Sequence, residues 1–72
     1  MDYWTKRRPD GNWESKAAGA SRASSVSDTQ QAAWTRSQEL ARQSGGEAFL
    51  CNRHGQIRER NTYGHDPRNI KG

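Results

Sequence analysis

The sequence has little of what secreted, membrane or metal-binding proteins contain. It has one cysteine, Cys51, so no disulfide can form within the chain, and a lone thiol is typical of a reducing compartment. No apolar run approaches the roughly 18 residues of a membrane span, and no apolar secretion signal follows Met1. Cys51, His54 and His65 lack the spacing of a metal site. These absences predict a cytoplasmic protein without metal, cofactor or membrane contact.

The chain is also short and polar for a folded protein. Its 72 residues suffice for one domain, and only 29% are hydrophobic while 28% are charged. That composition lies toward the disordered end of the globular range, but three tryptophans, two tyrosines and one phenylalanine favour a folded core. Burial and conformational entropy nearly balance in a scaffold this small. We therefore expect marginal stability, with assembly into a homodimer as the remaining way to increase it.

The first third of the sequence predicts a hairpin. Tyr3 to Arg7 is a strand, and Pro9-Asp10-Gly11 has the chemistry of a type I turn with a glycine bulge. The return strand, Trp13 to Lys16, places Trp13 and Ser15 on one face. Arg22 to Val26 is a candidate third strand, with Val26 as its core anchor.

A helix follows from Gln30 to Ser44, a stretch without glycine or proline. Ser27, Asp28 and Thr29 are N-cap candidates, and Ser27 and Gln30 have capping-box spacing. Gly45-Gly46 ends the helix. A narrow face of small residues is expected to pack on the sheet: Ala33, Ser37, Leu40, Ala41 and Ser44. Trp34 lies at the flank of this face, where it covers the core or contacts a partner.

The last third predicts a second hairpin. Residues 47–52 contain the most apolar stretch and are expected to form a central strand, with Cys51 buried in it. Arg53-His54-Gly55 repeats the earlier turn pattern, and Ile57 to Thr62 returns. The predicted fold is α+β: an antiparallel sheet of two hairpins packed on a single helix, in the order β-β-(β)-α-β-β. Residues 1–63 are the domain, and 64–72 are a flexible C-terminal tail.

Seven short segments with turn glycines, a core tryptophan and a helix cap occur in a specific order. They are RPDGNW at 8–13, GASRAS at 19–24, DTQ at 28–30, GGE at 45–47, GQIR at 55–58, TYG at 62–64 and DP at 66–67. From about Arg7 onward the chain resembles a small bacterial family, domain of unknown function 2188. The resemblance implies a bacterial, plasmid or phage origin and assigns no activity or site residue. The chain departs from the family at Trp34 and Ser37, where an aliphatic or alanine face is usual, and at Ser15, usually apolar.

Catalysis finds little support among these residues. A hydrolase needs a nucleophile, a base and an orienting group that converge. Cys51 is expected to be a buried core residue, and His54 is confined to the following turn. The carboxylates are scattered singly, and Gly45-Gly46 follows a helix, whereas phosphate-binding glycine loops precede one. We therefore expect a non-enzymatic protein.

Two binding functions remain open. Tryptophans and arginines exceed the needs of so small a core and are typical anchors of protein interfaces, which favours a protein-binding regulator or accessory module. The alternative is nucleic-acid binding by a basic hairpin face, since the net charge is +4. Arg58 and Arg60 share a parity and are expected to project from one face of the last strand, so that the basic residues form one stripe if the hairpins are neighbours. The contact residues predicted for either partner are Lys6, Arg7, Arg8, Arg53, Arg58, Arg60, Trp4 and Trp34.

Overall fold

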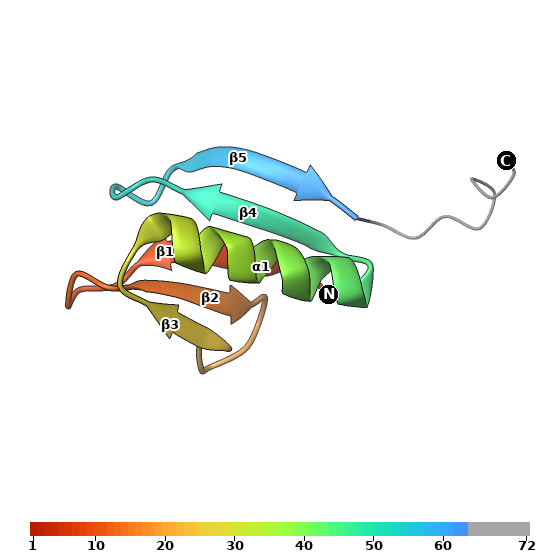
Figure 1. Ribbon diagram of the computed structural model, residues 1–72, viewed down its shortest axis with the longest axis horizontal. Coiled ribbons are helices and arrows are strands. Elements are labelled where there is room, and N and C mark those ends of the chain that lie inside the picture. The colour runs from red at the N-terminus through yellow and green to blue at the C-terminus, as the bar shows by residue number, and fades with distance from the viewer. Residues whose placement is uncertain (64–72) are drawn as a thin grey trace, which may run out of the picture.

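The computed structural model describes residues 1–63 and has one helix packed across a five-stranded sheet (Figure 1). The elements are β1 (Tyr3–Arg7), β2 (Trp13–Ala17), β3 (Ser25–Ser27), α1 (Gln30–Ser44), β4 (Glu47–Cys51) and β5 (Ile57–Thr62). The α+β class, the order of the elements and the helix boundaries are confirmed. The third strand is present but starts three residues later than predicted. The predicted tail, residues 64–72, lies outside the described residues.

The sheet is mixed, so the predicted antiparallel sheet of two hairpins is confirmed only in part: the β1–β2 and β4–β5 hairpins are antiparallel, but the pairing that joins them is parallel. Its strand order is β3-β2-β1-β4-β5, in which β1 and β4 are parallel and the other neighbours are antiparallel. The helix explains this pairing. Its 15 residues span about 22 Å and return the chain along the sheet, so that β4 starts beside the start of β1.

The parallel pairing has a consequence for the surface. The turn after β1 (residues 8–12), the turn after β4 (residues 52–56) and the start of α1 all lie at one end of the molecule, which we call the turn end (Figure 1, left). An antiparallel β1–β4 pair would have placed the two turns at opposite ends.

The two turns are built alike, as their sequences predict. The Gly11 amide donates to the Arg8 carbonyl at 3.0 Å, and the Gly55 amide donates to the Asn52 carbonyl at 2.9 Å. Both glycines have positive φ, 91° and 84°, which side-chain-bearing residues rarely adopt. Each hairpin therefore closes with a tight turn followed by a glycine.

Helix α1 has defined caps at both ends. Thr29 is the N-cap, and its hydroxyl accepts a hydrogen bond from the Ala32 amide at 3.1 Å. Because the cap is Thr29 and alanine stands three residues on, the capping box predicted at Ser27 and Gln30 is wrong. Gly45 ends the helix in the left-handed conformation with φ of 72°, as expected.

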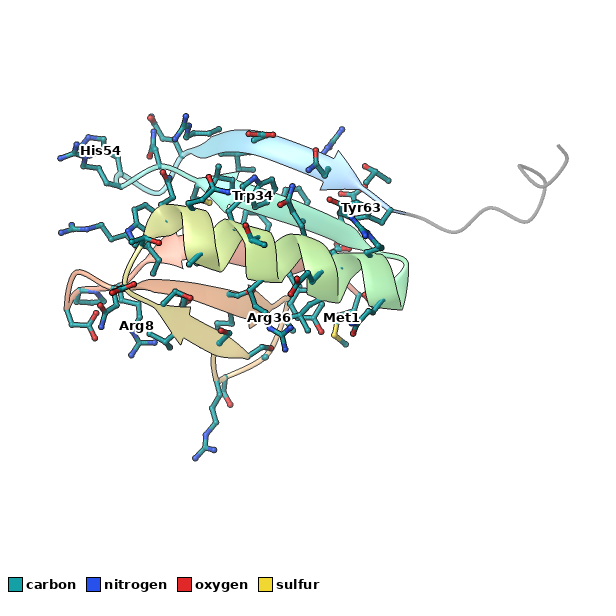
Figure 2. All side chains as sticks on the ribbon, viewed as in Figure 1. Met1, Arg8, Trp34, Arg36, His54 and Tyr63 are labelled. Carbon is teal, nitrogen blue, oxygen red and sulfur yellow. The ribbon has the colours of Figure 1, made fainter. Side chains whose placement is uncertain are left out.

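The apolar core lies between α1 and the central strands. Trp34, only 6% exposed, packs with Ala41, Ala48 and Leu50, and Tyr3 and Tyr63 flank them. Figure 2 shows the labelled Trp34 between the helix and β4. The open question about Trp34 is thus settled: it is a core residue, and it is unavailable as a partner contact.

Two other expectations about packing are wrong. The buried helix positions include Trp34 but neither Leu40, which is half-buried, nor Ser44, which is exposed. Val26 is 49% exposed and does not anchor the core. It pairs with Glu14 on the side of the sheet away from the helix, because the register turns Ser25 and Ser27 toward α1.

A small polar layer completes the helix–sheet contact. Thr5, Ser15 and Ser37 are each 0% exposed. The Thr5 hydroxyl donates to Ser37 Oγ at 2.6 Å, and the Ser15 and Ser37 oxygens are 2.5 Å apart. Small side chains allow α1 to approach β1 and β2 closely, and their hydroxyls satisfy one another away from water.

Candidate functional site

The face of the sheet opposite α1 is not covered by any helix among residues 1–63, and we call it the open face. Strand register places four side chains in a row across it, from β2 to β5. Lys16 is paired with Trp4, Trp4 with Phe49, and Phe49 with Arg60. This set, which we call the aromatic row, has two rings in the middle and a cation at each side.

The two rings form one stacked unit. The centroids of Trp4 and Phe49 are 4.3 Å apart, with 19° between the ring planes. Both residues are half-buried, although they lie away from the core. Lys6 Nζ lies 5.5 Å from the Trp4 ring centroid, within the range of a cation–π contact. The open face therefore carries an aromatic platform with a third cation above it.

A hollow of about 260 Å³ lies against Trp4 on the side of β2. Its lining comes from β1, β2 and the turn after β2: Trp4, Lys6, Glu14, Lys16, Ala17, Ala18, Gly19 and Ala20. Glu14, the one carboxylate in this lining, accepts a hydrogen bond from Arg8 Nη1 at 3.2 Å. The charges left to face a ligand in the hollow are therefore those of two lysines.

A second concave surface lies at the turn end, with a volume of about 330 Å³. We call it the turn pocket. Its lining residues are Arg7, Trp13, Gln30, Asn52, Arg53, His54 and Arg58. Figure 2 shows His54 and Arg8 on the two hairpin turns at this end. Trp13 is half-buried and forms part of the pocket wall.

The basic residues predicted as one stripe occupy two surfaces. Lys6 and Arg60 belong to the open face, whereas Arg7, Arg53 and Arg58 line the turn pocket. Lys6 and Arg7 are consecutive in β1 and therefore face opposite sides of the sheet. For Arg58 and Arg60 the cause is an irregularity between Leu50 and Cys51, which interrupts the alternation of β5. As a result Arg58 Nη1 donates to Gln30 Oε1 of α1 at 3.3 Å, and it does not share a face with Arg60.

Arg8 is the predicted contact residue whose charge is already compensated. It forms ion pairs with Asp10 at 3.5 Å and Glu14 at 3.2 Å. The pKa of Asp10 lies below its ordinary value, chiefly because the Asn12 amide donates to its carboxylate at 2.9 Å and also because Arg8 is close. Arg8 therefore stabilises its own turn.

Cys51 is 1% exposed, and burial raises the pKa of its thiol above the ordinary value. Lys6 opposes this shift with a smaller effect. A thiol in this state is a weak nucleophile at neutral pH. His54 is exposed in the turn, and its backbone amide donates to Asn52 Oδ1 at 2.8 Å. The geometry gives no support to a Cys51–His54 catalytic pair.

Two members of the aromatic row, Phe49 and Lys16, were not predicted as contact residues. Phe49 lies in the stretch predicted as a central apolar strand, and Lys16 ends the predicted return strand. Their position follows from side-chain alternation combined with the parallel β1–β4 register. The sequence shows which side chains of one strand share a face, but it does not show that β1 and β4 are paired. The aromatic row can therefore be recognised only when this pairing is known.

The fold and these surfaces define a small α+β domain with an open sheet face that carries aromatic and basic side chains. Residues 3–63 match the family described as "Uncharacterized protein conserved in bacteria (DUF2188)", and the chain belongs to this family. The predicted resemblance is thereby confirmed. No curated protein and no solved structure matches the chain. Among residues 1–63, no helix is long and apolar enough to cross a membrane.

Proposed function

We propose that this domain binds single-stranded nucleic acid on its open face. The observation that carries the proposal is the aromatic row, in which the Trp4–Phe49 stack lies between Lys16 and Arg60. Bases stack on aromatic rings whatever their sequence, and cations beside the rings neutralise the backbone phosphates. This arrangement supports binding with little sequence preference.

The geometry indicates where a base would bind. Phe49 covers one side of the Trp4 ring, and the hollow against Trp4 leaves space beside β2. A base in that hollow would stack on Trp4, with Lys6 and Lys16 close to its phosphates. Stacking of one base contributes about 1–3 kcal/mol in such sites. A duplex is disfavoured as a ligand, because its bases are already stacked on one another.

A protein partner, which the sequence alone slightly favoured, is less well supported. Interfaces with proteins usually centre on a contiguous apolar patch. The exposed large hydrophobic residues among those described are Met1, Val26 and Ile57. Val26 and Ile57 belong to β3 and β5, the two opposite edge strands of the sheet, so they do not adjoin. Between them lies the aromatic row with its cations, which is better suited to a polyanion.

The test is fluorescence anisotropy with a labelled oligothymidylate that lacks a terminal phosphate. We expect saturable binding that weakens steeply between about 50 and about 200 mM salt. Trp4→Ala should weaken it by about tenfold or more, since this variant removes the stacking surface. Lys16→Ala/Arg60→Ala should reduce the steepness of the salt dependence, by about 0.7 for each phosphate that the variant no longer neutralises.

A matched control separates this site from general charge. Arg22→Ala/Arg36→Ala also removes two positive charges, one from an exposed loop residue and one from an exposed helix residue. This control should leave affinity close to that of the wild type. Equal weakening by both double variants would contradict the proposal, and so would full affinity in Trp4→Ala. Retention of a protein from a host lysate after nuclease treatment, with no oligonucleotide binding, would instead support the protein-binding alternative.

A further inference from the structure

The turn pocket is separate from the open face and has a charge pattern of its own. Three of its seven lining residues are arginines, Arg7, Arg53 and Arg58, and none is a carboxylate. Among residues 1–63, these three arginines form no ion pair, whereas Arg8 and Arg36 do. Guanidinium groups repel one another when they share a concavity without an anion. Their convergence at this pocket therefore calls for an anionic ligand.

Hydrogen bonds hold the pocket walls in place. Asn52 Oδ1 accepts from the backbone amides of His54 at 2.8 Å and Gln56 at 3.0 Å. Asn52 Nδ2 donates to Gln56 Oε1 at 3.2 Å. These bonds fix the backbone of the turn that carries Arg53. The backbone position from which the Arg53 side chain extends is thus set before any ligand binds.

Gln30 performs the same task for Arg58. Its Nε2 donates to the Cys51 carbonyl of β4 at 3.2 Å, and its Oε1 accepts from Arg58 Nη1 at 3.3 Å. Both polar atoms of the Gln30 amide are thereby engaged, and the first residue of α1 is tied to β4 and β5. Arg58 retains further N–H groups for a ligand, because a guanidinium has five.

We propose that the turn pocket binds a phosphomonoester group. A single arginine guanidinium can bind two oxygens of a phosphate group through two parallel N–H bonds, a geometry that lysine lacks. A phosphomonoester carries about two negative charges at neutral pH, which suits three guanidiniums better than the single charge of a phosphodiester. Trp13 supplies an apolar wall for the group esterified to the phosphate. The helix N-terminus at this end has no acidic residue in its first turn, so its field adds to the attraction.

The test compares adenosine monophosphate with adenosine, using amide chemical shifts in two-dimensional NMR spectra of the whole chain. We expect the monophosphate to cause saturable shifts at Gln30, Arg53 and His54, and adenosine to cause none. Inorganic phosphate should shift the same amides, since the proposal assigns recognition to the phosphate. Equal responses to adenosine and its monophosphate would overturn the proposal, as would shifts that never saturate.

Variants locate the site. Arg53→Ala should weaken binding of the monophosphate by about tenfold or more, the effect of removing a charge-assisted hydrogen bond. Arg58→Lys keeps the charge but not the paired N–H geometry, and it should also weaken binding. The control Arg22→Ala removes one exposed arginine elsewhere and should leave affinity unchanged. If Arg22→Ala weakens binding as much as Arg53→Ala, only net charge matters and the proposal is wrong.

This site and the open face can fail independently. Trp4→Ala should leave binding of the monophosphate intact, and Arg53→Ala should leave binding of the unphosphorylated oligothymidylate intact. An oligothymidylate with a 5′-phosphate distinguishes a strand end from a free nucleotide as the source of the group. If the added phosphate strengthens binding in the wild type but not in Arg53→Ala, the ligand is a strand end. Binding of the monophosphate alone supports a nucleotide-type ligand.

Discussion

The hydroxyl oxygens of Ser15 and Ser37 lie 2.5 Å apart, and both side chains are completely buried. The two residues face each other across the contact between β2 and α1, and each is the hydrogen-bond partner of the other. Thr5 joins them as a donor to Ser37.

We predict that Ser37→Ala destabilises the domain by about 1–3 kcal/mol, because it leaves the buried hydroxyls of Thr5 and Ser15 without their shared partner. Urea unfolding followed by circular dichroism measures the change. The triple variant Thr5→Val/Ser15→Ala/Ser37→Ala should be less destabilised than Ser37→Ala alone, because no unpaired hydroxyl remains. Ser24→Ala, on an exposed residue, should change stability by less than about 0.5 kcal/mol. If the triple variant is less stable than Ser37→Ala, the hydroxyls themselves stabilise the contact and the prediction is wrong.

Local chemistry made the elements of this fold predictable. Turn glycines, the N-cap threonine and a helix without glycine or proline mark boundaries that depend on near neighbours in the chain. The pairing of β1 with β4 depends instead on where α1 returns the chain, and no local pattern encodes it. The sequence left open whether Trp34 is buried, because it lies at the flank of the small-residue face of the helix. It belongs to the core because Ala48 and Leu50 of β4 pack against it.

The same distinction applies to the candidate sites. Trp4 and the arginines were identified from residue type and charge, but their grouping was not. The aromatic row requires β1 and β4 to be adjacent and in register. The separation of Arg58 from Arg60 requires the irregularity opposite Cys51. A shift of one residue in the register moves a side chain to the other face of the sheet. A stripe predicted from odd and even positions alone therefore fails wherever a strand contains such a shift.

The tryptophans should differ in their contribution to stability. Trp34→Ala empties the centre of the core and should cost about 3–5 kcal/mol, enough to unfold much of so small a domain. Trp4→Ala should cost less, since Trp4 is half-buried on the open face and its removal chiefly abolishes the stack on Phe49. Urea unfolding by circular dichroism compares the two, with Trp34→Phe as a milder core variant. A destabilisation in Trp4→Ala as large as that in Trp34→Ala would contradict this assignment of core and surface.

Asp10 should make stability depend on pH in the acid range. Its pKa in the folded state is below the ordinary value of 3.8, so its contribution is full above about pH 3.8 and is lost as the pH falls through the lower folded value. Asp10→Asn keeps an oxygen for the Asn12 amide but removes the charge near Arg8. The variant should therefore be less stable than wild type at neutral pH, and the difference should shrink at lower pH. The difference in stability is measured from the urea midpoints of both proteins at neutral pH and again below pH 3.8. A difference that does not change with pH would exclude the mechanism.

Cys51 should react slowly in the folded protein. Its thiol is buried with a raised pKa, and alkylation proceeds through the thiolate, so iodoacetamide must wait for an opening that exposes the side chain. We expect alkylation followed by mass spectrometry to be much slower in buffer than in urea. Ser37→Ala should accelerate the reaction in buffer, because the exposed population rises as stability falls. A rate in buffer equal to that in urea would mean that the thiol is accessible in the native state, which would reopen the question of a nucleophilic role for Cys51.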